Sequence, residues 1–402
     1  MIWEIPQLSQ DLVLERALGA QILEKANQGA LPTASLRKIA KALASLSGTF
    51  TAEREKIGKR YLDQEETRCA YLLYFLQSNL PKVWYVLREL TLNPAGEFDS
   101  EELRVLDLGS GSGTAGLAVS WFVSQFCGGT KRLQITAIDN SAPALSDYRW
   151  LIQRLNIPIQ ESGRQLDIEL TTIAGEMEKL QLPADAKYDL IFLSNSLNEL
   201  YHASSDSIEK RAQYLNKIIK NHLAESGACA IIEPALQSVS RSFHQVRDRL
   251  VDSGWHVYSP CVSDRHCPML SRDRDWCHQT IDWRRPAVVK QLDELIGNRK
   301  ERLKFSYVVF RKEEMRTIDC SEVPGKLYRA VGDLQSEKGK DMIYLCGSEG
   351  PLPHTLLKRD RTENNRSFLE ISRGDIVEIR TGDDGDHERI KPEDSINLKT
   401  PD

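Results

Sequence analysis

The sequence VLDLGSGSGTAGLAV (Val105–Val119) has the pattern of a β-strand, a glycine-rich turn and the start of a helix. Gly109, Gly111 and Gly113 permit positive φ angles and a close backbone approach, so the turn can wrap around a ligand. Apolar runs alternate with helical segments from here to about residue 312, which predicts βαβ units and a mostly parallel sheet. Such sheets bind ligands at the carboxyl ends of their strands. The stretch therefore predicts an α/β domain with a nucleotide site.

Asp107 lies two residues before the first glycine, and the D-x-G-x-G-x-G pattern of residues 107–113 resembles motif I of the class I methyltransferases. That resemblance implies binding of S-adenosylmethionine. Residues 111–116 also match G-x-G-x-x-G, so NAD is the alternative ligand. Asp139 ends the next predicted strand, where a carboxylate can bridge the two ribose hydroxyls of an adenosine. The predicted cofactor-binding residues are Asp107, Gly109, Ser110, Gly111, Gly113, Asp139, Glu176 and Asn195.

No catalytic residue can be assigned from the sequence. Asn195, Asn198 and Glu199 follow the fourth strand, where class I enzymes often keep catalytic groups, but the D/N-P-P-Y sequence of exocyclic-amine methylation is absent. Pro260-Cys261 is similar to the nucleophilic pair of pyrimidine C5-methyltransferases, yet it follows the sixth strand, away from the expected place. Whether the chain is an enzyme therefore stays open.

The predicted organisation has four parts. Residues 1–95 are helical, with breaks at Pro32 and Pro81, and residues 96–315 form a class I methyltransferase-like doubly wound domain with a cysteine-rich loop at 259–279. Its predicted strands cover residues 103–109, 133–139, 167–175, 188–195, 227–234, 254–260 and 304–312. A small β domain at 316–380 has predicted strands at 341–347, 354–360, 367–372 and 375–380. Residues 381–402 are acidic and are predicted to be a disordered tail.

Composition limits the cellular setting. The 402 residues carry a net charge of only −5, so any nucleic-acid surface must be local. The N-terminus lacks the pattern of a signal or transit peptide, and the chain has no apolar stretch long enough to span a membrane. We therefore expect a cytoplasmic, monomeric protein without a membrane partner. Its thiols would stay reduced, so clustered cysteines indicate a metal site.

Cys261, Cys267 and Cys277 form the cluster, with the spacing C-x5-C-x9-C. Structural zinc sites usually show closer pairs, although His266 or His278 could complete a zinc tetrahedron. Iron–sulfur clusters take four thiolates, often three local and one remote. Cys346 is the preferred remote ligand and Cys320 the alternative. Spacing alone leaves iron–sulfur, zinc and unliganded thiols open.

Several motifs together resemble the methyltransferase-like ribosomal small-subunit assembly family of bacteria and mitochondria. They are Glu-Pro (233–234), Cys-x5-Cys-Pro (261–268), Asp-Trp-Cys-His (275–278), Lys-Phe-Ser-Tyr (304–307) and Leu-Cys-x-x-x-Gly (345–350). Mitochondrial members carry a 4Fe-4S cluster on four cysteines and associate with the small ribosomal subunit. The resemblance implies that Cys261, Cys267, Cys277 and Cys346 hold such a cluster here. It also implies a role in small-subunit assembly, with or without methyl transfer.

A basic run could contact rRNA. From residue 283 to 312 there are nine basic and three acidic residues, a local charge of +6. Trp276 and Trp283 are available to stack on bases. The predicted function is therefore an S-adenosylmethionine-binding, iron–sulfur protein of small-subunit assembly that contacts rRNA. The alternative is an active RNA or protein methyltransferase with a structural zinc site.

Overall fold

The computed structural model of the chain describes residues 2–19, 33–51, 60–93, 100–161, 163–318, 323–381 and 388–399. These residues form two compact units. Unit 1 is Met1–Leu87, Phe98–Ile232 and Ile281–Leu303, and unit 2 is Arg88–Glu97, Glu233–Thr280 and Lys304–Asp402. The four-part division expected from the sequence is finer and stays a prediction.

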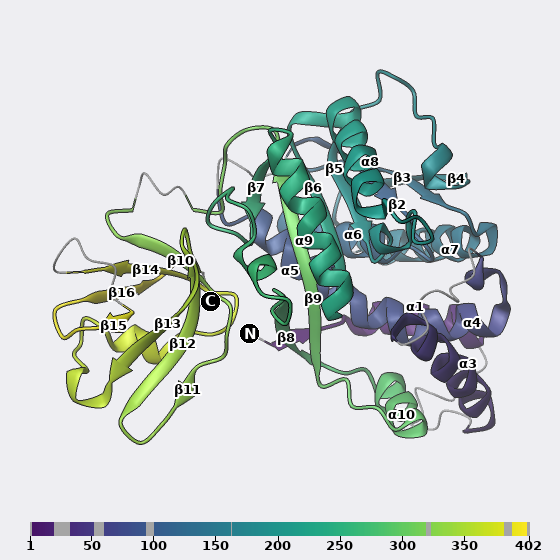
Figure 1. The fold of residues 1–402 in the computed structure, drawn as a ribbon. Helices are drawn as coiled ribbons and strands as arrows, with labels where there is room; N and C mark the ends of the chain where they lie inside the picture. The colour runs from purple at the N-terminus through teal and green to yellow at the C-terminus, as the bar shows by residue number, and fades with distance from the viewer. Residues whose placement is uncertain are drawn as a thin grey trace. The chain divides into compact units, whose positions relative to one another are not determined.

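A parallel sheet forms the centre of unit 1 (Figure 1). Its strands run in the order β6-β5-β2-β3-β4, and each of these pairs is parallel. Such an order places the first strand in the middle and gives the doubly wound fold its switch point there. Val105, Leu106 and Leu108 of the central strand are buried, as expected for a parallel sheet covered on both faces. The strands are β2 (Glu102–Leu108), β3 (Arg132–Asp139), β4 (Asp167–Ala174), β5 (Tyr188–Ser194) and β6 (Leu223–Pro234).

Helices follow the strands in turn and complete the βαβ units. Helix α6 contacts β2, β3 and β5, and helix α7 contacts β3 and β4. Unit 1 also contains a short parallel pair, in which Trp3 of β1 lies opposite Trp283 of β8. The elements are α6 (Thr114–Phe126), α7 (Ala142–Glu161), η5 (Met177–Lys179), η6 (Leu197–Glu199), α8 (Ser207–His222), α10 (Ala287–Ile296), β1 (Ile2–Glu4) and β8 (Gln279–Arg284).

The N-terminal segment is helical, as predicted, but it does not break at Pro81. Helix α5 continues through this proline, which normally costs about 3 kcal/mol in a helix interior. Leu80, Val83 and Leu87 around it are buried, and this packing outweighs the local cost. A π-helical turn precedes α5. The elements are α1 (Gln7–Leu18), α3 (Thr33–Thr51), η2 (Tyr61–Asp63), α4 (Glu65–Ala70), η3 (Tyr71–Leu76) and α5 (Gln77–Leu90).

Unit 2 contains the cysteine-rich loop and a second sheet. Strand β7 pairs antiparallel with β9, and helix α9 precedes β7 in the chain. The second sheet has the order β15-β13-β12-β10-β14-β16, with β11 beside β12, and is drawn green to yellow in Figure 1. The elements are α9 (Gln237–Asp252), β7 (His256–Ser259), η7 (Pro268–Ser271), β9 (Arg302–Arg311), β10 (Lys326–Ala330), β11 (Gln335–Ser336), β12 (Lys340–Gly347), β13 (Gly350–Leu357), η9 (Lys358–Asp360), η10 (Arg366–Glu370), β14 (Ile376–Arg380), β15 (Arg389–Ile390) and β16 (Ser395–Leu398).

Two predictions for this sheet are wrong. The expected strand at 367–372 is mainly the 3₁₀ helix η10, because it buries Phe368 and Ile371 in the core from a turn. Within the expected disordered tail, residues 389–390 and 395–398 are strands β15 and β16. Ile390 and Ile396 fill the sheet core, so a locally acidic composition hid two strands that the core needs.

The predicted fold class is confirmed. The chain is an α/β protein with a class I methyltransferase-like doubly wound sheet, an N-terminal helical region and a small C-terminal β domain. Among the helices that the structure describes, none is long and apolar enough to cross a membrane.

Candidate functional site

The glycine turn after β2 has the left-handed conformation that its sequence predicts. Gly109, Gly111 and Gly113 have φ angles of 67°, 52° and 94°. The backbone N–H groups of Gly109 and Ser110 both donate to the carbonyl oxygen of Ile138, at 2.8 and 3.0 Å. This fixes the turn at the carboxyl edge of the sheet, between β2 and β3.

Close packing explains why the turn is rich in glycine. A Cβ atom on Gly109 would lie 2.4 Å from the Cβ atom of Ser196, and one on Gly113 would lie 2.1 Å from the Cδ2 atom of Tyr148. On Gly116 it would lie 1.4 Å from the Tyr148 hydroxyl. The third glycine of the G-x-G-x-x-G match therefore makes room for a tyrosine.

Asp107 lies buried beneath this turn. Its Oδ2 atom accepts hydrogen bonds from the backbone N–H of Gly116 and from the Tyr148 hydroxyl, both at 3.3 Å. Burial raises the pKa of Asp107 from 3.8 to about 7, although the two hydrogen bonds lower it in part. The carboxyl is thus an internal brace of the turn that titrates near neutral pH.

Asp139 ends β3 and faces the turn directly. Its Oδ2 atom accepts from the backbone N–H of Gly111 and its Oδ1 atom from that of Ser141, both at 2.8 Å. Burial raises its pKa, while these hydrogen bonds lower it and the nearby Asp63 raises it further. Each oxygen retains a second lone pair, so the carboxylate can still accept from a ribose hydroxyl.

Two hydroxyl groups in the turn have no partner. Ser110 and Ser112 are buried, and within the described part of the chain their Oγ atoms make no hydrogen bond. Native proteins satisfy nearly all buried polar atoms, so an unmet pair in one turn indicates a ligand-binding surface.

The remaining predicted residues, Asn195 and Glu176, follow β5 and β4. Asn195 has a φ angle of 61°, and its backbone N–H donates to Ile232. Next to it, the Ser196 hydroxyl donates to the carbonyl of Leu108 at 2.8 Å. Glu176 is partly exposed and pairs with Lys179 at 3.3 Å. Met177, its neighbour, reaches to 3.1 Å from the position of a Cβ atom on Gly109.

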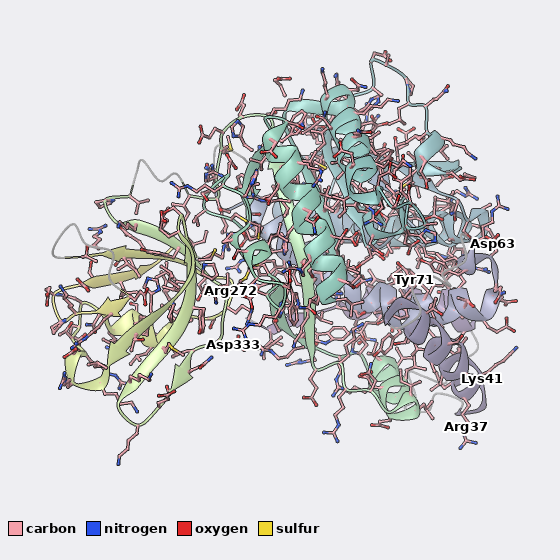
Figure 2. All side chains as sticks on the ribbon, viewed as in Figure 1. Arg37, Lys41, Asp63, Tyr71, Arg272 and Asp333 are labelled. Atoms are coloured by element: carbon pink, nitrogen blue, oxygen red, sulfur yellow. The ribbon has the colours of Figure 1, made fainter. Side chains whose placement is uncertain are left out.

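The sequence interpretation missed a contribution from the N-terminal helical region (Figure 2). Asp63 accepts a hydrogen bond from the Ser141 hydroxyl at 2.7 Å, and Tyr61 donates to Glu199 at 3.4 Å. The Tyr71 hydroxyl lies 3.7 Å from the position of a Cβ atom on Gly111. Burial raises the pKa of Tyr71, and the carboxylates of Glu199, Asp139 and Asp107 raise it further. In the sequence, only the close spacing of aromatic and acidic residues at 61–71 could have indicated that these side chains lie beside the glycine turn.

The four predicted metal ligands all belong to unit 2. Cys261, Cys267 and Cys277 line one pocket together with His244, Arg247 and His278. Cys346 is close enough to affect its partners: burial, then Cys261 and Cys346, raises the pKa of Cys277 to about 12. Burial, Cys261 and Cys267 likewise raise the pKa of Cys346 to about 12. The fold therefore brings the four thiols into one neighbourhood.

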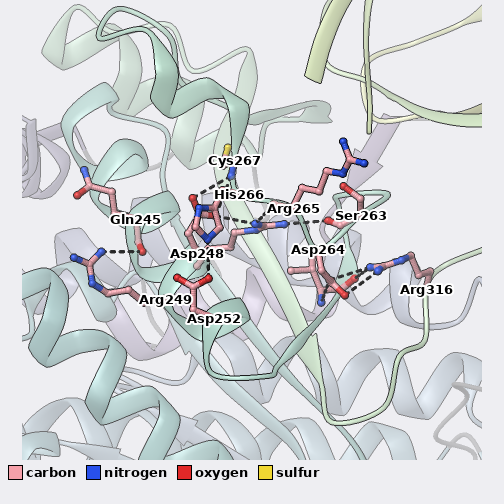
Figure 3. A network of polar contacts seen from close by, with 12 residues as sticks. Gln245, Asp248, Arg249, Asp252, Ser263, Asp264, Arg265, His266, Cys267 and Arg316 are labelled. Atoms are coloured by element: carbon pink, nitrogen blue, oxygen red, sulfur yellow. Dashed lines mark hydrogen bonds and ion pairs between the residues drawn. The ribbon is translucent and has the colours of Figure 1, made fainter. Parts of the chain in front are cut away.

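Helix α9 holds the loop that carries three of these cysteines. Asp248 accepts the backbone N–H of Cys267 at 3.0 Å with both oxygens (Figure 3), and His244 contacts the carbonyl of Cys277 at 3.2 Å. Arg241 donates to the carbonyls of Met269 and Asp275 at 3.0 and 2.7 Å. Arg241, His244 and Asp248 are three or four residues apart, so one helix face supports the whole loop.

A second support comes from β10. The Arg329 guanidinium donates to the carbonyl of Pro260 at 2.9 Å and to both carboxylate oxygens of Glu89 at 3.1 and 2.9 Å. Arg329 is also the ladder partner of Cys346. One buried arginine thus links the residue before Cys261 to the strand of Cys346.

The other candidate ligands are distributed differently. His266 is exposed and pairs with Asp252 at 2.7 Å, whereas His278 lines the pocket and its buried Nδ1 atom has no partner among the described residues. Cys320 lies outside the described residues. Within them, no group of three or more His, Cys, Asp or Glu side chains is placed to hold a metal ion as it stands. The metal site therefore stays a prediction.

Part of the basic run at 283–312 makes contacts within the protein. Arg285 pairs with Asp293 at 2.8 Å, Arg302 with Asp282 at 3.0 Å, and Arg311 lies over the ring of Tyr258. The expectation that Trp283 stacks on RNA bases is wrong: it is buried, and its indole N–H donates to the carbonyl of Lys300 at 2.7 Å. The apolar pattern of β8 buries it. Lys290, Arg299 and Lys304 remain exposed.

Comparison with known proteins gives a family. The model of the family described as mitochondrial small ribosomal subunit Rsm22 matches residues 65–376. The sequence matches none of the curated proteins with which it was compared.

Several solved structures that resemble the chain are described as methyltransferases. A putative class I S-adenosylmethionine-dependent methyltransferase from Listeria monocytogenes is 12% identical, covers 78% of this chain and 95% of its own, and has a TM-score of 0.37. The plantazolicin methyltransferase BpumL in complex with SAH is 11% identical, with 76% and 96% covered and a TM-score of 0.33. A putative rRNA methylase from Clostridium thermocellum is 13% identical, with 58% and 97% covered and a TM-score of 0.31. Similarities this low say nothing about ligand or activity.

Proposed function

Because the chain belongs to the family of the mitochondrial small ribosomal subunit protein Rsm22, we propose that it acts in assembly of the small ribosomal subunit through rRNA contact. The family match carries this proposal, since it covers both the glycine turn and all four clustered cysteines. We propose a monomer in the cytoplasm. The family description, in contrast, names a mitochondrial protein. Finding the tagged chain in an organellar fraction of the cell would contradict the proposed cytoplasmic location.

We further propose that the glycine turn binds S-adenosylmethionine. Two buried hydroxyls without partners, on Ser110 and Ser112, and the second lone pairs of the Asp139 carboxylate support this ligand. Acidic residues gather here, because Asp63 and Asp107 lie near Asp139. A sulfonium cation suits such surroundings better than the pyrophosphate of NAD does. When bound, the cofactor supplies a methyl group that is open to nucleophilic attack.

The four cysteines fit an iron–sulfur cluster by the chemistry of their donors. Each is partly shielded from solvent, and the loop that carries three of them is held through backbone groups by α9, which leaves the thiols free to bind. Cys261, Cys267, Cys277 and Cys346 would hold the cluster. Its contribution would be structural, because binding free energy adds to folding free energy when ligands come from separate segments.

The alternative is an active RNA or protein methyltransferase with a structural zinc ion. The unpartnered Nδ1 atom of His278 in the cysteine pocket favours zinc, since imidazole is a common zinc ligand. Glu199, which accepts a hydrogen bond from Tyr61, would be the candidate general base.

Metal content decides between these two. Protein purified without oxygen is expected to hold about four irons and four sulfides per chain, with a broad visible band that bleaches on reduction. One zinc and no sulfide would reject the cluster and support the alternative.

A second experiment separates a scaffold from a methyltransferase. Asp107→Ala with Gly109→Val should abolish binding of S-adenosylmethionine, because the valine side chain would collide with Ser196. Gly128→Ala is the matched control, since a Cβ atom there meets nothing within 4 Å. We expect the double variant to keep its association with the small ribosomal subunit. Loss of association together with cofactor binding would contradict a scaffold role.

A further inference from the structure

We infer that Arg247 donates a hydrogen bond from its Nε atom to a sulfur of the iron–sulfur cluster and thereby raises the cluster's reduction potential. The inference rests on the proposed function, since it requires that the four cysteines hold a cluster. It assigns Arg247 a positioning and tuning role.

One nitrogen atom of the Arg247 guanidinium, Nε, makes no hydrogen bond to the described residues. The residue lies on α9, is 1% exposed and lines the pocket together with Cys261, Cys267 and Cys277. Its Nη1 atom donates to the Asp248 carboxylate at 2.7 Å and to the carbonyl of Arg265, and its Nη2 atom donates to the carbonyl of Ser263 at 3.0 Å. The Nε atom is buried and has no partner among the described residues.

Because the guanidinium is planar, its other contacts fix the direction of the Nε–H bond of Arg247. Because both terminal nitrogens are bound to the loop and to Asp248, the group cannot rotate to satisfy Nε elsewhere. An unmet buried donor destabilises the folded protein, and a charged one more so, so an acceptor is expected. The acceptors that this pocket offers in number are the cysteine sulfurs.

A cluster on four thiolates is negatively charged, and N–H groups directed at its sulfurs favour the reduced form. Asp248 offsets the positive charge of Arg247, so the effect would come mainly from the directed N–H. Arg247 also holds the loop through the carbonyls of Ser263 and Arg265. The position of the loop and the reduction potential of the cluster would therefore depend on the same side chain.

The test compares Arg247→Lys with Arg241→Lys, both purified without oxygen. Arg241 lies on the same helix, α9, and holds the same loop, through the carbonyls of Met269, Arg272 and Asp275, but it does not line the pocket. Iron and sulfide are measured first, and the midpoint potential follows from a redox titration monitored by EPR. At a fixed solution potential, the ratio of reduced to oxidised cluster should fall about tenfold in Arg247→Lys. For a one-electron couple this corresponds to a midpoint potential that is lower by about 59 mV. Arg241→Lys should keep the potential of the unmodified protein.

An unchanged potential in Arg247→Lys, or an equal shift in both variants, would overturn the inference. Absence of iron and sulfide from the unmodified protein would instead reject the proposed cluster. If Arg247→Lys fails to hold a cluster, pulsed EPR of the unmodified protein with ¹⁵N-labelled arginine replaces it. A guanidinium nitrogen coupled to the reduced cluster supports the inference, and no such coupling overturns it.

Discussion

Among single residues, Asp107 braces the glycine turn but lowers the stability of the folded protein at neutral pH. Its carboxyl is buried under the glycine turn with two hydrogen bonds at 3.3 Å. The pKa is raised from 3.8 to about 7, mainly by burial. Between these values the unfolded chain is ionised and the folded chain is protonated, so stability falls as pH rises from about 4 to 7. A residue kept only for packing would not need a carboxyl here.

Asp107→Asn should therefore stabilise the ligand-free protein. The amide oxygen can still accept from Gly116 and Tyr148, and the ionisation cost is removed, so we expect a gain of roughly 1 to 4 kcal/mol above pH 7. The gain should shrink towards pH 4. Thermal denaturation of both proteins at pH 5 and pH 8 measures this, and a variant that is less stable at pH 8 would contradict it.

Gly116 and Tyr148 show the limit of a motif at the same scale. The G-x-G-x-x-G match is real, but the third glycine faces the Tyr148 hydroxyl, and that tyrosine in turn braces Asp107. Asp107, Gly111 and Asp139 were identified from the sequence because their roles follow from position along a strand–turn–helix unit. The partner tyrosine lies on another helix, 32 residues after Gly116 in the numbering, and no local pattern marks it.

At the level of helices and strands, α9 and β14 both carry polar residues that hold neighbouring segments in place. The polar face of α9 looks like an ordinary solvated helix face in the sequence, yet Arg241, His244 and Asp248 support the cysteine loop. In β14, Glu378 is fully buried and bridges neighbouring segments. It accepts from Arg380 at 2.6 Å, Lys399 at 3.0 Å and the backbone N–H of Gly325 at 3.1 Å.

Glu378→Gln is expected to weaken the C-terminal sheet by about 1 to 3 kcal/mol at neutral pH, because one oxygen acceptor becomes a donor facing other donors. Burial raises the pKa of Glu378, but its hydrogen bonds to Arg380 and Lys399 prevail and lower it from 4.5 to about 2. Its stabilising effect is therefore complete above pH 4.5 and is lost as pH falls through 2. Hydrogen exchange of the β14 and β16 amides at pH 7 and pH 3 reads this out.

The exposed Glu363 provides a control for that experiment, since its side chain is 90% exposed. Glu363→Gln should leave the exchange rates unchanged. Equal protection in Glu378→Gln and in the unmodified chain at pH 7 would show that the buried carboxylate contributes nothing to the sheet.

At the scale of the whole molecule, the four clustered cysteines come from two separate segments of unit 2. Cys261, Cys267 and Cys277 lie in the loop supported by α9, and Cys346 lies on β12 of the second sheet. Gly350, with a φ angle of 102°, lets Pro268 approach the turn after β12: a Cβ atom on Gly350 would lie 2.9 Å from it. The strand and the loop are therefore packed together before any metal is considered.

Cys346→Ser should lose most of the iron and destabilise the C-terminal sheet, because a remote ligand ties that sheet to the loop. Iron analysis and hydrogen exchange of β12 and β13 measure the two effects. Cys69→Ser is the matched control, since Cys69 is a half-buried cysteine of α4 in unit 1. Unchanged iron in Cys346→Ser would reject Cys346 as a ligand.

Local patterns were enough to predict the doubly wound sheet, the glycine turn with Asp107 and Asp139, and the cysteine-rich loop, because strand periodicity, positive φ and thiol chemistry are local properties. Which groups meet in space follows from the tertiary fold. It placed Tyr61, Asp63 and Tyr71 beside the turn, buried Trp283, and made residues 389–398 part of a sheet. These outcomes depend on burial against segments far away in the chain, which local patterns do not encode.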